Sequence, residues 1–214
     1  MLVSEIFARF RRQIGDDGTV QFTDADLLRW INDACREIAQ DNDILQVKAT
    51  SPTTSGTAEY LLPSNILKLH SVRWKGNKLS ALGINEWDDF ISQSTVDASV
   101  PGDPTHVLQW ANSITLFPKP VTSSSDLTLL YSRQPVPVTL STQEPDVPDT
   151  YHLSIVRYCL AQAAEMDDDA ELYRAKMNEF TDDVMKKRSD RDIEDDVYPS
   201  ISVAARDTSW GDVW

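Results

Sequence analysis

Few residues of the chain have the type and spacing that catalytic or cofactor chemistry requires. The histidines, His70, His106 and His152, lie far apart, and none belongs to a paired metal-ligand pattern such as HExxH. The patterns GxSxG, GxxxxGKS/T and GxGxxG are absent from a chain with only seven glycines. The sequence therefore predicts a protein that is not an enzyme and that binds no cofactor. Each histidine is expected to be a hydrogen-bonded structural residue.

Two acidic clusters, EMDDDAE at residues 165–171 and DIEDDV at residues 192–197, suggest a calcium site. An EF-hand loop, however, places its ligands at alternating positions around a central glycine and ends in a glutamate. Neither cluster fits, so no metal site is predicted, and the three aspartates 167–169 are interpreted as a cap for the helix that follows. A hydrolase that used these acids would need two converging carboxylates, and the sequence offers no frame that brings them together.

Charge and cysteine content limit the partners and the compartment. The net charge of −14 argues against a surface that grips nucleic acid, because phosphate neutralisation needs clustered Lys and Arg. Residues 144–214 hold 18 acids and 8 bases, which indicates either a solvated helix face or a surface that repels a passing polyanion. Cys35 and Cys159 lie among apolar neighbours and are expected to be buried thiols in a reducing compartment. No signal peptide and no membrane-spanning segment are expected.

The N-terminal residues predict two helices. Apolar residues recur at helical spacing from Leu2 to Ile14, and Gly15 marks the end of that segment. Thr23 is the expected N-cap of the second helix, with Asp26 three residues later in a capping-box arrangement. A 4-3-4 rhythm then indicates one buried face, made of Leu27, Ile31, Ala34 and Ile38.

Residues 45–147 predict a β-rich domain of short strands in a small antiparallel sandwich. Hairpin turns are expected at Gly76–Asn77 and at Asn112–Ser113. Residues 84–94 are expected to form one short helix, and Pro135 and Pro137 suit only an edge or a bend. The tryptophans inside these elements, Trp74, Trp87 and Trp110, are interpreted as core residues rather than as a sugar-stacking platform.

After Pro148 the pattern is helical again. Asp149 is the expected N-cap of a mostly apolar helix, and a second helix carries Tyr173, Met177, Phe180 and Val184 on one face. Its bases Lys186, Lys187 and Arg188 come late, as the helix dipole favours. The predicted fold class is α+β. Residues 1–44 and 148–191 form a helical bundle, residues 45–147 form the β-rich insert, and residues 192–214 form an extended C-terminal arm.

The arm carries two of the six tryptophans within the last five residues of the chain. Chain termini are usually polar and loosely held, so these rings need a binding surface. Either the arm folds onto a groove of its own body or it binds a partner. Its apolar contact points are Tyr198, Ile201, Val203, Trp210, Val213 and Trp214.

The order of these segments resembles the head-to-tail adaptor proteins of short-tailed bacteriophages, also called connector or tail tubular proteins. Four stretches, which together span most of residues 20–188, carry the resemblance: DLLRWINDACREIA, YLLPSNILKLHSVRW, SITLFPKP joined to LTLLYSRQPVPVT, and VPDTYHLSIVRYCLAQAAEMDDDAELYRAKMNEF. The resemblance rests on the order of the segments and on the general character of their sequences, not on a strict motif.

This resemblance implies a structural virion protein, made in the host cytoplasm and located at the head–tail junction. It implies a homo-oligomeric ring, generally of twelve copies, beneath the portal protein. The helices and the arm residues named above would contact the portal, and the β part would face the tail nozzle or tail tube. Double-stranded DNA would pass through the ring during ejection without specific binding. The alternative is a carbohydrate- or surface-recognition β-sandwich module, with Trp74 and Trp110 as exposed stacking residues.

Overall fold

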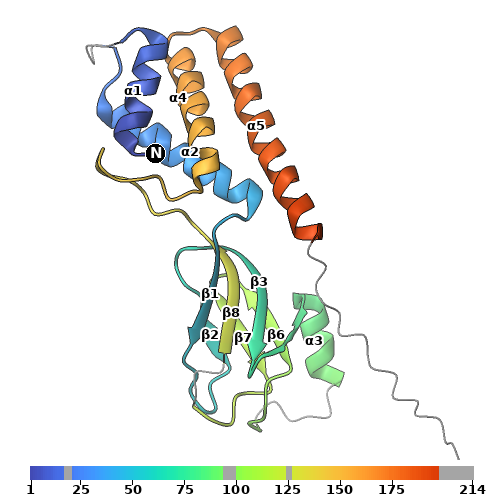
Figure 1. The fold of residues 1–214 in the computed structure, drawn as a ribbon. Helices are drawn as coiled ribbons and strands as arrows, with labels where there is room; N and C mark the ends of the chain where they lie inside the picture. Colours follow the sequence, from blue (N-terminus) through green and yellow to red (C-terminus); the bar gives the residue numbers. More distant parts are fainter. Residues whose placement is uncertain (17–20, 94–99, 124–126, 198–214) are drawn as a thin grey trace, which may run out of the picture.

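A computed structural model describes residues 1–16, 21–93, 100–123 and 127–197. The fold is mixed α+β, and helices and strands gather at opposite ends of an elongated molecule (Figure 1). One end holds four helices and a short 3-10 turn. They are α1 (Val3–Ile14), α2 (Asp24–Asn42), η1 (Asp149–Tyr151), α4 (His152–Met166) and α5 (Ala170–Val197). This end is called the helical part below.

The predicted ends of the first two helices are confirmed. The C-cap of α1 is Gly15, whose φ of 76° lies in the left-handed region that glycine tolerates. The Thr23 side chain caps α2 by accepting a hydrogen bond of 3.2 Å from the Asp26 backbone N–H. The Asp26 carboxylate in turn accepts the Thr23 backbone N–H at 3.3 Å, which completes the capping box.

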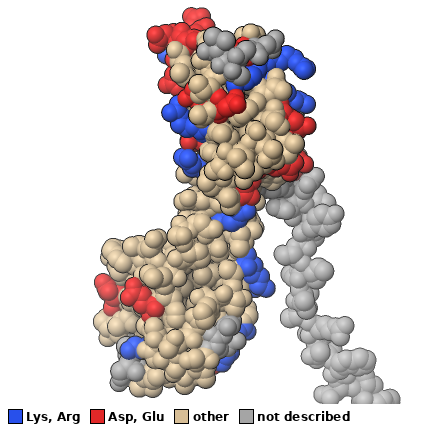
Figure 2. Space-filling model, turned by 90° about the vertical axis from the view of Figure 1, so that its left-hand side faces the viewer, with Lys and Arg blue, Asp and Glu red and all other residues tan. Residues whose placement is uncertain are grey.

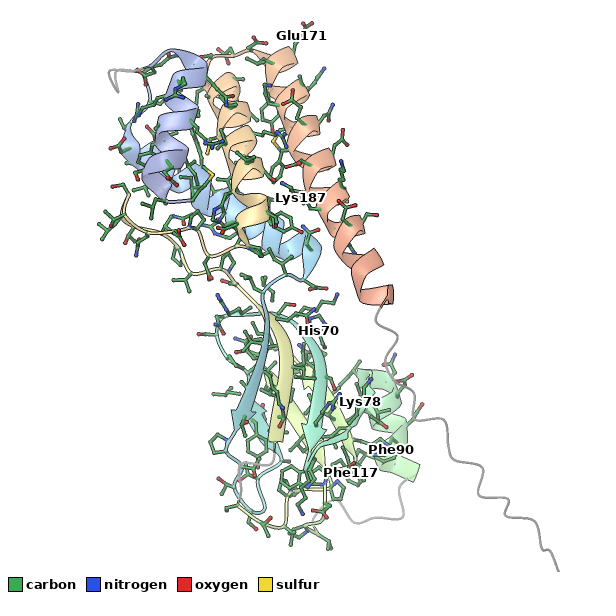
Figure 3. The ribbon with its side chains drawn as sticks, viewed as in Figure 1. His70, Lys78, Phe90, Phe117, Glu171 and Lys187 are labelled. Atoms are coloured by element: carbon green, nitrogen blue, oxygen red, sulfur yellow. The ribbon has the colours of Figure 1, made fainter. Side chains whose placement is uncertain are left out.

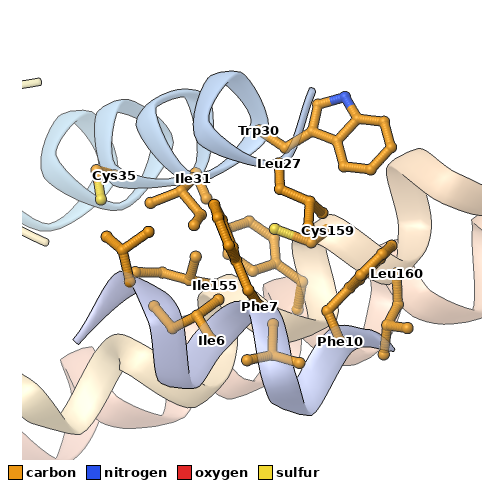
Figure 4. Close-up of a cluster of buried hydrophobic side chains, with 14 of the residues drawn as sticks. Ile6, Phe7, Phe10, Leu27, Trp30, Ile31, Cys35, Ile155, Cys159 and Leu160 are labelled. Carbon is orange, nitrogen blue, oxygen red and sulfur yellow. The ribbon is translucent and has the colours of Figure 1, made fainter. Parts of the chain in front are cut away.

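The helical part packs around one hydrophobic cluster (Figure 4). Phe10, Phe22 and Trp30 form an edge-to-face trio, with ring centroids 5.7–6.1 Å apart. Both cysteines are free thiols buried in this cluster, as the sequence predicts. Val138 and Val147 also belong to the cluster, so the connection after the last strand packs against the helices.

The other end of the molecule, called the β part below, holds two four-stranded sheets. Sheet A has the order β1-β8-β3-β4, made of β1 (Gln46–Ser51), β3 (Ile66–Trp74), β4 (Asn77–Lys78) and β8 (Leu127–Arg133). Sheet B has the order β2-β7-β6-β5, made of β2 (Glu59–Leu61), β5 (Ser80–Leu82), β6 (His106–Trp110) and β7 (Ser113–Phe117). Side chains of both sheets, including Val72, Leu129 and Leu116, share a second hydrophobic cluster.

Helix α3 (Ile84–Gln93) is the predicted short helix, and it packs against sheet B. Phe90 and Phe117 meet edge to face at a centroid distance of 5.3 Å, and Figure 3 shows the two rings together between α3 and the strands. The expectation that all strands are antiparallel is wrong for one pair, because β5 and β6 run parallel. Parallel neighbours need a crossover of a dozen or more residues, and the segment that contains α3 provides it.

Both hairpins exist, but each turn lies one residue earlier than predicted. Trp74 pairs with Asn77, so the first turn consists of Lys75 and Gly76, with φ values of 48° and 85°. A two-residue type I′ turn requires positive φ at both central positions, and glycine supplies one of them at no steric cost. In the second hairpin Trp110 pairs with Ser113, which places the turn at Ala111 and Asn112.

The C-terminal helices differ from the prediction at two ends. Asp149 does not cap α4; it begins η1, which is closed by a 2.9 Å bond from Tyr151 N–H to the Pro148 carbonyl, and α4 begins at His152. Helix α5 does not end near Arg191 but continues to Val197. An apolar face is not required to continue a helix, and the sequence has no Gly or Pro between Ala170 and Pro199. The bases 186–188 therefore lie inside α5 rather than at its end.

We expect Phe10→Ala to lower the free energy of unfolding by about 3–5 kcal/mol, because Phe10 is fully buried and contacts two other aromatic rings. Urea denaturation of the full chain measures the change. Gln13→Ala, on the exposed side of the same helix, is the control and should change stability by no more than about 0.5 kcal/mol. A loss below about 1 kcal/mol for Phe10→Ala would show that the aromatic trio does not hold the helical part together.

Candidate interaction surfaces

The predicted portal-binding residues, Tyr198, Ile201, Val203, Trp210, Val213 and Trp214, all lie outside the described residues. The structure gives the point from which the arm starts. Helix α5 ends at Val197, beyond the nearer end of α4 and on the side of the helical part that faces the β part (Figure 1).

A partly buried polar cluster holds α5 against α4. The Asp183 carboxylate accepts hydrogen bonds of 2.6 Å from Ser154 Oγ and from Lys187 Nζ, and it pairs with Arg157 Nη1 at 2.6 Å. Ser154 is fully buried. Lys187 also lies over the Tyr151 ring, 5.5 Å from its centroid. Figure 3 shows Lys187 on α5, well along the helix from Glu171 near its start.

The charge state of Asp183 follows from these contacts. Burial by itself would raise the pKa of the Asp183 carboxyl, but hydrogen bonds from Lys187, Ser154 and Arg157 outweigh it, so the pKa lies below its usual value of 3.8. The carboxylate is therefore ionised at neutral pH and stabilises the α4–α5 contact.

Two ion pairs join the helical part to the β part. Asp43, at the end of α2, accepts a 2.8 Å hydrogen bond from Lys68 Nζ in β3. Arg133, the last residue of β8, forms a bidentate pair with Asp146, and the Asp146 carboxylate also accepts the Val136 backbone N–H at 2.7 Å. These contacts link the two parts where the chain passes between them.

Each histidine has a hydrogen-bond partner, as predicted. His70 Nε2 lies 2.7 Å from Ser132 Oγ, and His152 Nε2 lies 3.0 Å from the Val147 carbonyl oxygen. His106 lies 2.8 Å from Thr105 Oγ1 and its ring lies against Phe90, with centroids 4.2 Å apart. Among the residues that the structure describes, no group of three or more His, Cys, Asp or Glu side chains could hold a metal ion.

The thiols are held in their protonated form. Burial, as the main cause, raises the pKa of the Cys35 thiol to about 12. Burial also raises the pKa of the Cys159 thiol. A thiol of this kind is a poor nucleophile at neutral pH, since the thiolate is the reactive form. Both cysteines therefore behave as small apolar side chains of the helical core.

Two tryptophans of the β part differ in exposure. Trp74 is buried, with 3% of its surface accessible, and its Nε1–H donates to Asp103 at 3.1 Å. Trp110 is 61% exposed, so the expectation that it is a core residue is wrong. Trp110 ends β6 directly before the turn and pairs with Ser113 of β7. Leu61 of β2 pairs with the same Ser113 from the other side of β7 and is 80% exposed. A stacking platform of Trp74 and Trp110 does not exist, because only one of the rings is accessible.

A cleft of about 570 Å³ opens between the sheets, lined by segments of β3, β5 and β6 and by Lys78 of β4. Its lining includes His70 and Ser71 but no Asp or Glu, so it has no pair of carboxylates for acid–base hydrolysis. The Ser71 hydroxyl is buried and has no hydrogen-bond partner among the described residues.

The charged side chains are distributed unevenly over the surface. In the view of Figure 2 the helical part carries many acidic and basic groups, whereas the broad face of the β part is largely uncharged. Lys and Arg gather along one edge of the β part in this view. No helix in the described ranges is long and apolar enough to span a bilayer.

A molecule with helices at one end, sheets at the other and ion pairs between them is suited to join other proteins. Comparison of the sequence places it among the structural adaptors of bacteriophages. The sequence model of the SU10 adaptor protein family matches residues 1–204. The chain belongs to this family, which confirms its resemblance to phage head–tail adaptors. It is accordingly a component of the phage particle that contacts other head or tail proteins. Comparison with individual curated proteins gives no significant match.

We expect Asp183→Asn to destabilise the protein by about 1–3 kcal/mol at pH 7, because it removes a charge-assisted acceptor for Lys187 and Arg157. Since the pKa of Asp183 is lowered in the folded state, this stabilisation is present above its usual pKa of 3.8 and is lost as the pH falls through the folded-state value.

The difference in unfolding free energy between wild type and Asp183→Asn should therefore shrink as the pH is lowered below about 4. Urea denaturation at a series of pH values measures it. The neighbouring exposed residue provides the control, since Asp182→Asn should have little effect at any pH. A difference that stays constant down to pH 3 would assign the effect of Asp183→Asn to packing rather than to charge.

Proposed function

We infer that the chain is a ring-forming adaptor that joins the portal to the tail and forms part of the channel for DNA ejection. The single observation that carries this proposal is the family match over residues 1–204, which includes both parts of the molecule and most of the arm. An elongated molecule with chemically different ends also suits a protein that contacts one neighbour with each end. In this proposal about twelve copies form the ring, as head–tail adaptors of short-tailed phages generally do.

The finer architecture that goes with this function has three segments. Residues 1–44 and 148–191 act as one helical bundle, residues 45–147 act as a sandwich of the two sheets, and residues 192–214 include the portal-binding arm. The two separate hydrophobic clusters support this division. The bundle and the arm would contact the portal, and the sandwich would face the tail nozzle or tail tube at the head–tail junction of the virion.

The role proposed for DNA is passage without specific binding. The net charge of −14 supports this role, because tight binding of DNA requires Lys and Arg side chains that neutralise its phosphates. Binding of that kind weakens steeply as the salt concentration rises. An acidic lumen would repel the duplex and keep it moving. No catalytic step is part of this role, and the chain is proposed to act by contact alone.

The proposal is tested by mixing the purified chain with the portal protein of the phage that encodes it and measuring the mass of the complex by native mass spectrometry. We expect one closed ring per portal, with a fixed number of copies, because cyclic symmetry repeats the same contact around the axis. Single copies attached at random to the portal, or no binding, would contradict a ring adaptor.

We expect the double substitution Trp210→Ala and Trp214→Ala to weaken portal binding and to leave folding unchanged. A tryptophan buried in a partner's pocket typically contributes ~2–4 kcal/mol, and repetition around a ring multiplies the effect. Co-sedimentation with portal measures binding, and thermal unfolding of the free chain measures stability.

The matched control is Thr208→Ala with Ser209→Ala, which shortens two polar side chains of the same segment. If the tryptophan variant bound portal as wild type does, the helical part would be the docking surface. If its melting temperature fell by several degrees, the rings would belong to the core of the chain itself.

A further inference from the structure

One edge of sheet A is open where it borders the cleft between the sheets. Strand β3 pairs with β8 along one side, but on its other side the short strand β4 pairs only with Arg73 and Trp74. Next to these pairs, the Leu79 N–H donates to the Val72 carbonyl at 2.9 Å. Among the strands that the structure describes, none pairs with residues 66–71 on this side. This stretch is called the open edge below.

The cleft of about 570 Å³ runs along the open edge. Its lining includes the consecutive β3 residues Leu69, His70, Ser71 and Val72. Successive side chains of a strand point to opposite faces, so a run of consecutive lining residues indicates that the cleft borders the edge of the strand. The Ser71 hydroxyl is buried and has no hydrogen-bond partner among the described residues. The cleft therefore offers backbone groups and one hydroxyl that an added strand can pair with.

Part of the cleft wall is apolar, and none of it is acidic. Leu79, Ala81 and Val107 also line the cleft, and the lining contains no Asp or Glu. An uncharged extended segment with apolar residues at every second position fits such a surface. One row of its side chains enters the cleft while its backbone adds to the edge of the sheet.

A segment of this kind occurs in the arm. Ser200–Ala204 reads SISVA, in which the β-branched residues Ile201 and Val203 alternate with small ones. This pattern predicts a strand with one buried face. Pro199 cannot continue a helix and favours an extended residue before it, so an extended segment is expected soon after α5. The arm lies outside the described residues, and this prediction rests on its sequence.

The arm starts close to the open edge. Helix α5 ends at Val197, and Figure 1 shows this end on the side of β3 and α3, away from β1. In Figure 3 His70 lies nearer to this helix end than Lys78 does, so the cleft extends away from it. Only two residues separate the helix from Ser200. A segment that leaves α5 here runs in the direction of β3, which also points away from the helical part (Figure 1).

The tether and the shape of the open edge both favour the arm of the same copy. A segment joined by a short linker has an effective concentration in the mM range, above the micromolar concentration at which a second copy competes. The register of β3 against β8 also shifts between Ile66 and Lys68 and between Leu69 and Ser71. Such bulges hinder pairing with the edge of another folded sheet. A single tethered segment can follow them.

We propose that Ser200–Ala204 dock in the cleft of their own copy as an added strand, parallel to β3 on its open edge, with Ile201 and Val203 turned into the cleft. The inference rests on the proposed function in one respect. The portal uses the same two residues in that function, so the portal and the cleft compete for the arm. The arm is then held by its own copy until the portal displaces it. Trp210 and Trp214 lie beyond the docked segment and remain available for the first contact with the portal.

Hydrogen exchange of the full-length chain without portal tests the docking. The arm variant carries Ile201→Asp and Val203→Asp, which weaken docking because they place unpaired charge in the cleft. We expect outward-pointing amides of residues 66–71 to exchange about tenfold faster in the arm variant than in the wild type, because an added strand protects them. The matched control, Thr208→Asp with Ser209→Asp, adds the same charge beyond the docked segment and should exchange as wild type does. Equal rates in all three chains would overturn the proposal.

Disulfide formation shows which copy supplies the arm. Lys68→Cys is combined with Ser200→Cys or with Ser202→Cys, whose side chains face away from the cleft in this proposal. The native cysteines are buried and do not compete. We expect a disulfide within one copy at micromolar concentration, seen as a monomer of altered mobility on a non-reducing gel. The control, Lys48→Cys with Ser202→Cys, places the first thiol on the far edge of the sheet and should stay reduced.

Two other results of this experiment would overturn the proposal. Disulfide-linked dimers would assign the open edge to the arm of a second copy. Equal linking of the Lys68 and Lys48 variants would show that the arm has no fixed position on the β part.

The outcomes also separate this inference from the proposed function. Addition of portal should raise the exchange of residues 66–71 to the rate of the arm variant, because the portal takes the arm. Protection that persisted in the portal complex would overturn the competition. Portal rings formed by a chain whose open edge is unprotected when free would overturn the docking and leave the adaptor function intact. A docked arm in a chain that never binds portal would overturn the adaptor function alone.

Discussion

The structure depends most on the burial of α4. This helix is apolar on most faces, and nine of its fifteen residues are buried, from His152 to Ala164. A helix of this composition must be covered on nearly all sides. Helices α1, α2 and α5 supply that cover from both ends of the sequence, and the connection that carries Val138 and Val147 completes it. Closing the helical part in this way brings the start and the end of the β segment together, so the sheets leave from one end.

The cover given by α5 is partial, and this has a consequence for charge. Phe180 and Val184 are buried against the other helices and Asp183 fixes the register, but beyond Lys187 the helix has left α4. Because no apolar face is required of that stretch, its sequence can be rich in acids, and residues 190–196 hold five of them.

Local signals could be predicted from the sequence, and long-range placement could not. Gly15, the Thr23–Asp26 capping box and the buried face of α2 were predictable because each depends on neighbouring residues. The parallel pairing of β5 with β6 and the exposure of Trp110 depend on where the sheet edge lies, which no short pattern encodes. The end of α5 at Val197 was missed because the last residues of the helix are mostly polar and show no apolar residues at helical spacing. The predicted portal-binding role of the arm residues, from Tyr198 to Trp214, stays a prediction, because these residues lie outside the described part of the chain.

The central claim is that copies of this chain form a ring between the portal and the tail, and cryo-electron microscopy of the head–tail junction of the phage particle tests it most directly. The account predicts a closed ring of this fold, with the helical part toward the portal and the sheets toward the tail. Density that contained this chain only as isolated copies, or that placed it away from the junction, would contradict the account.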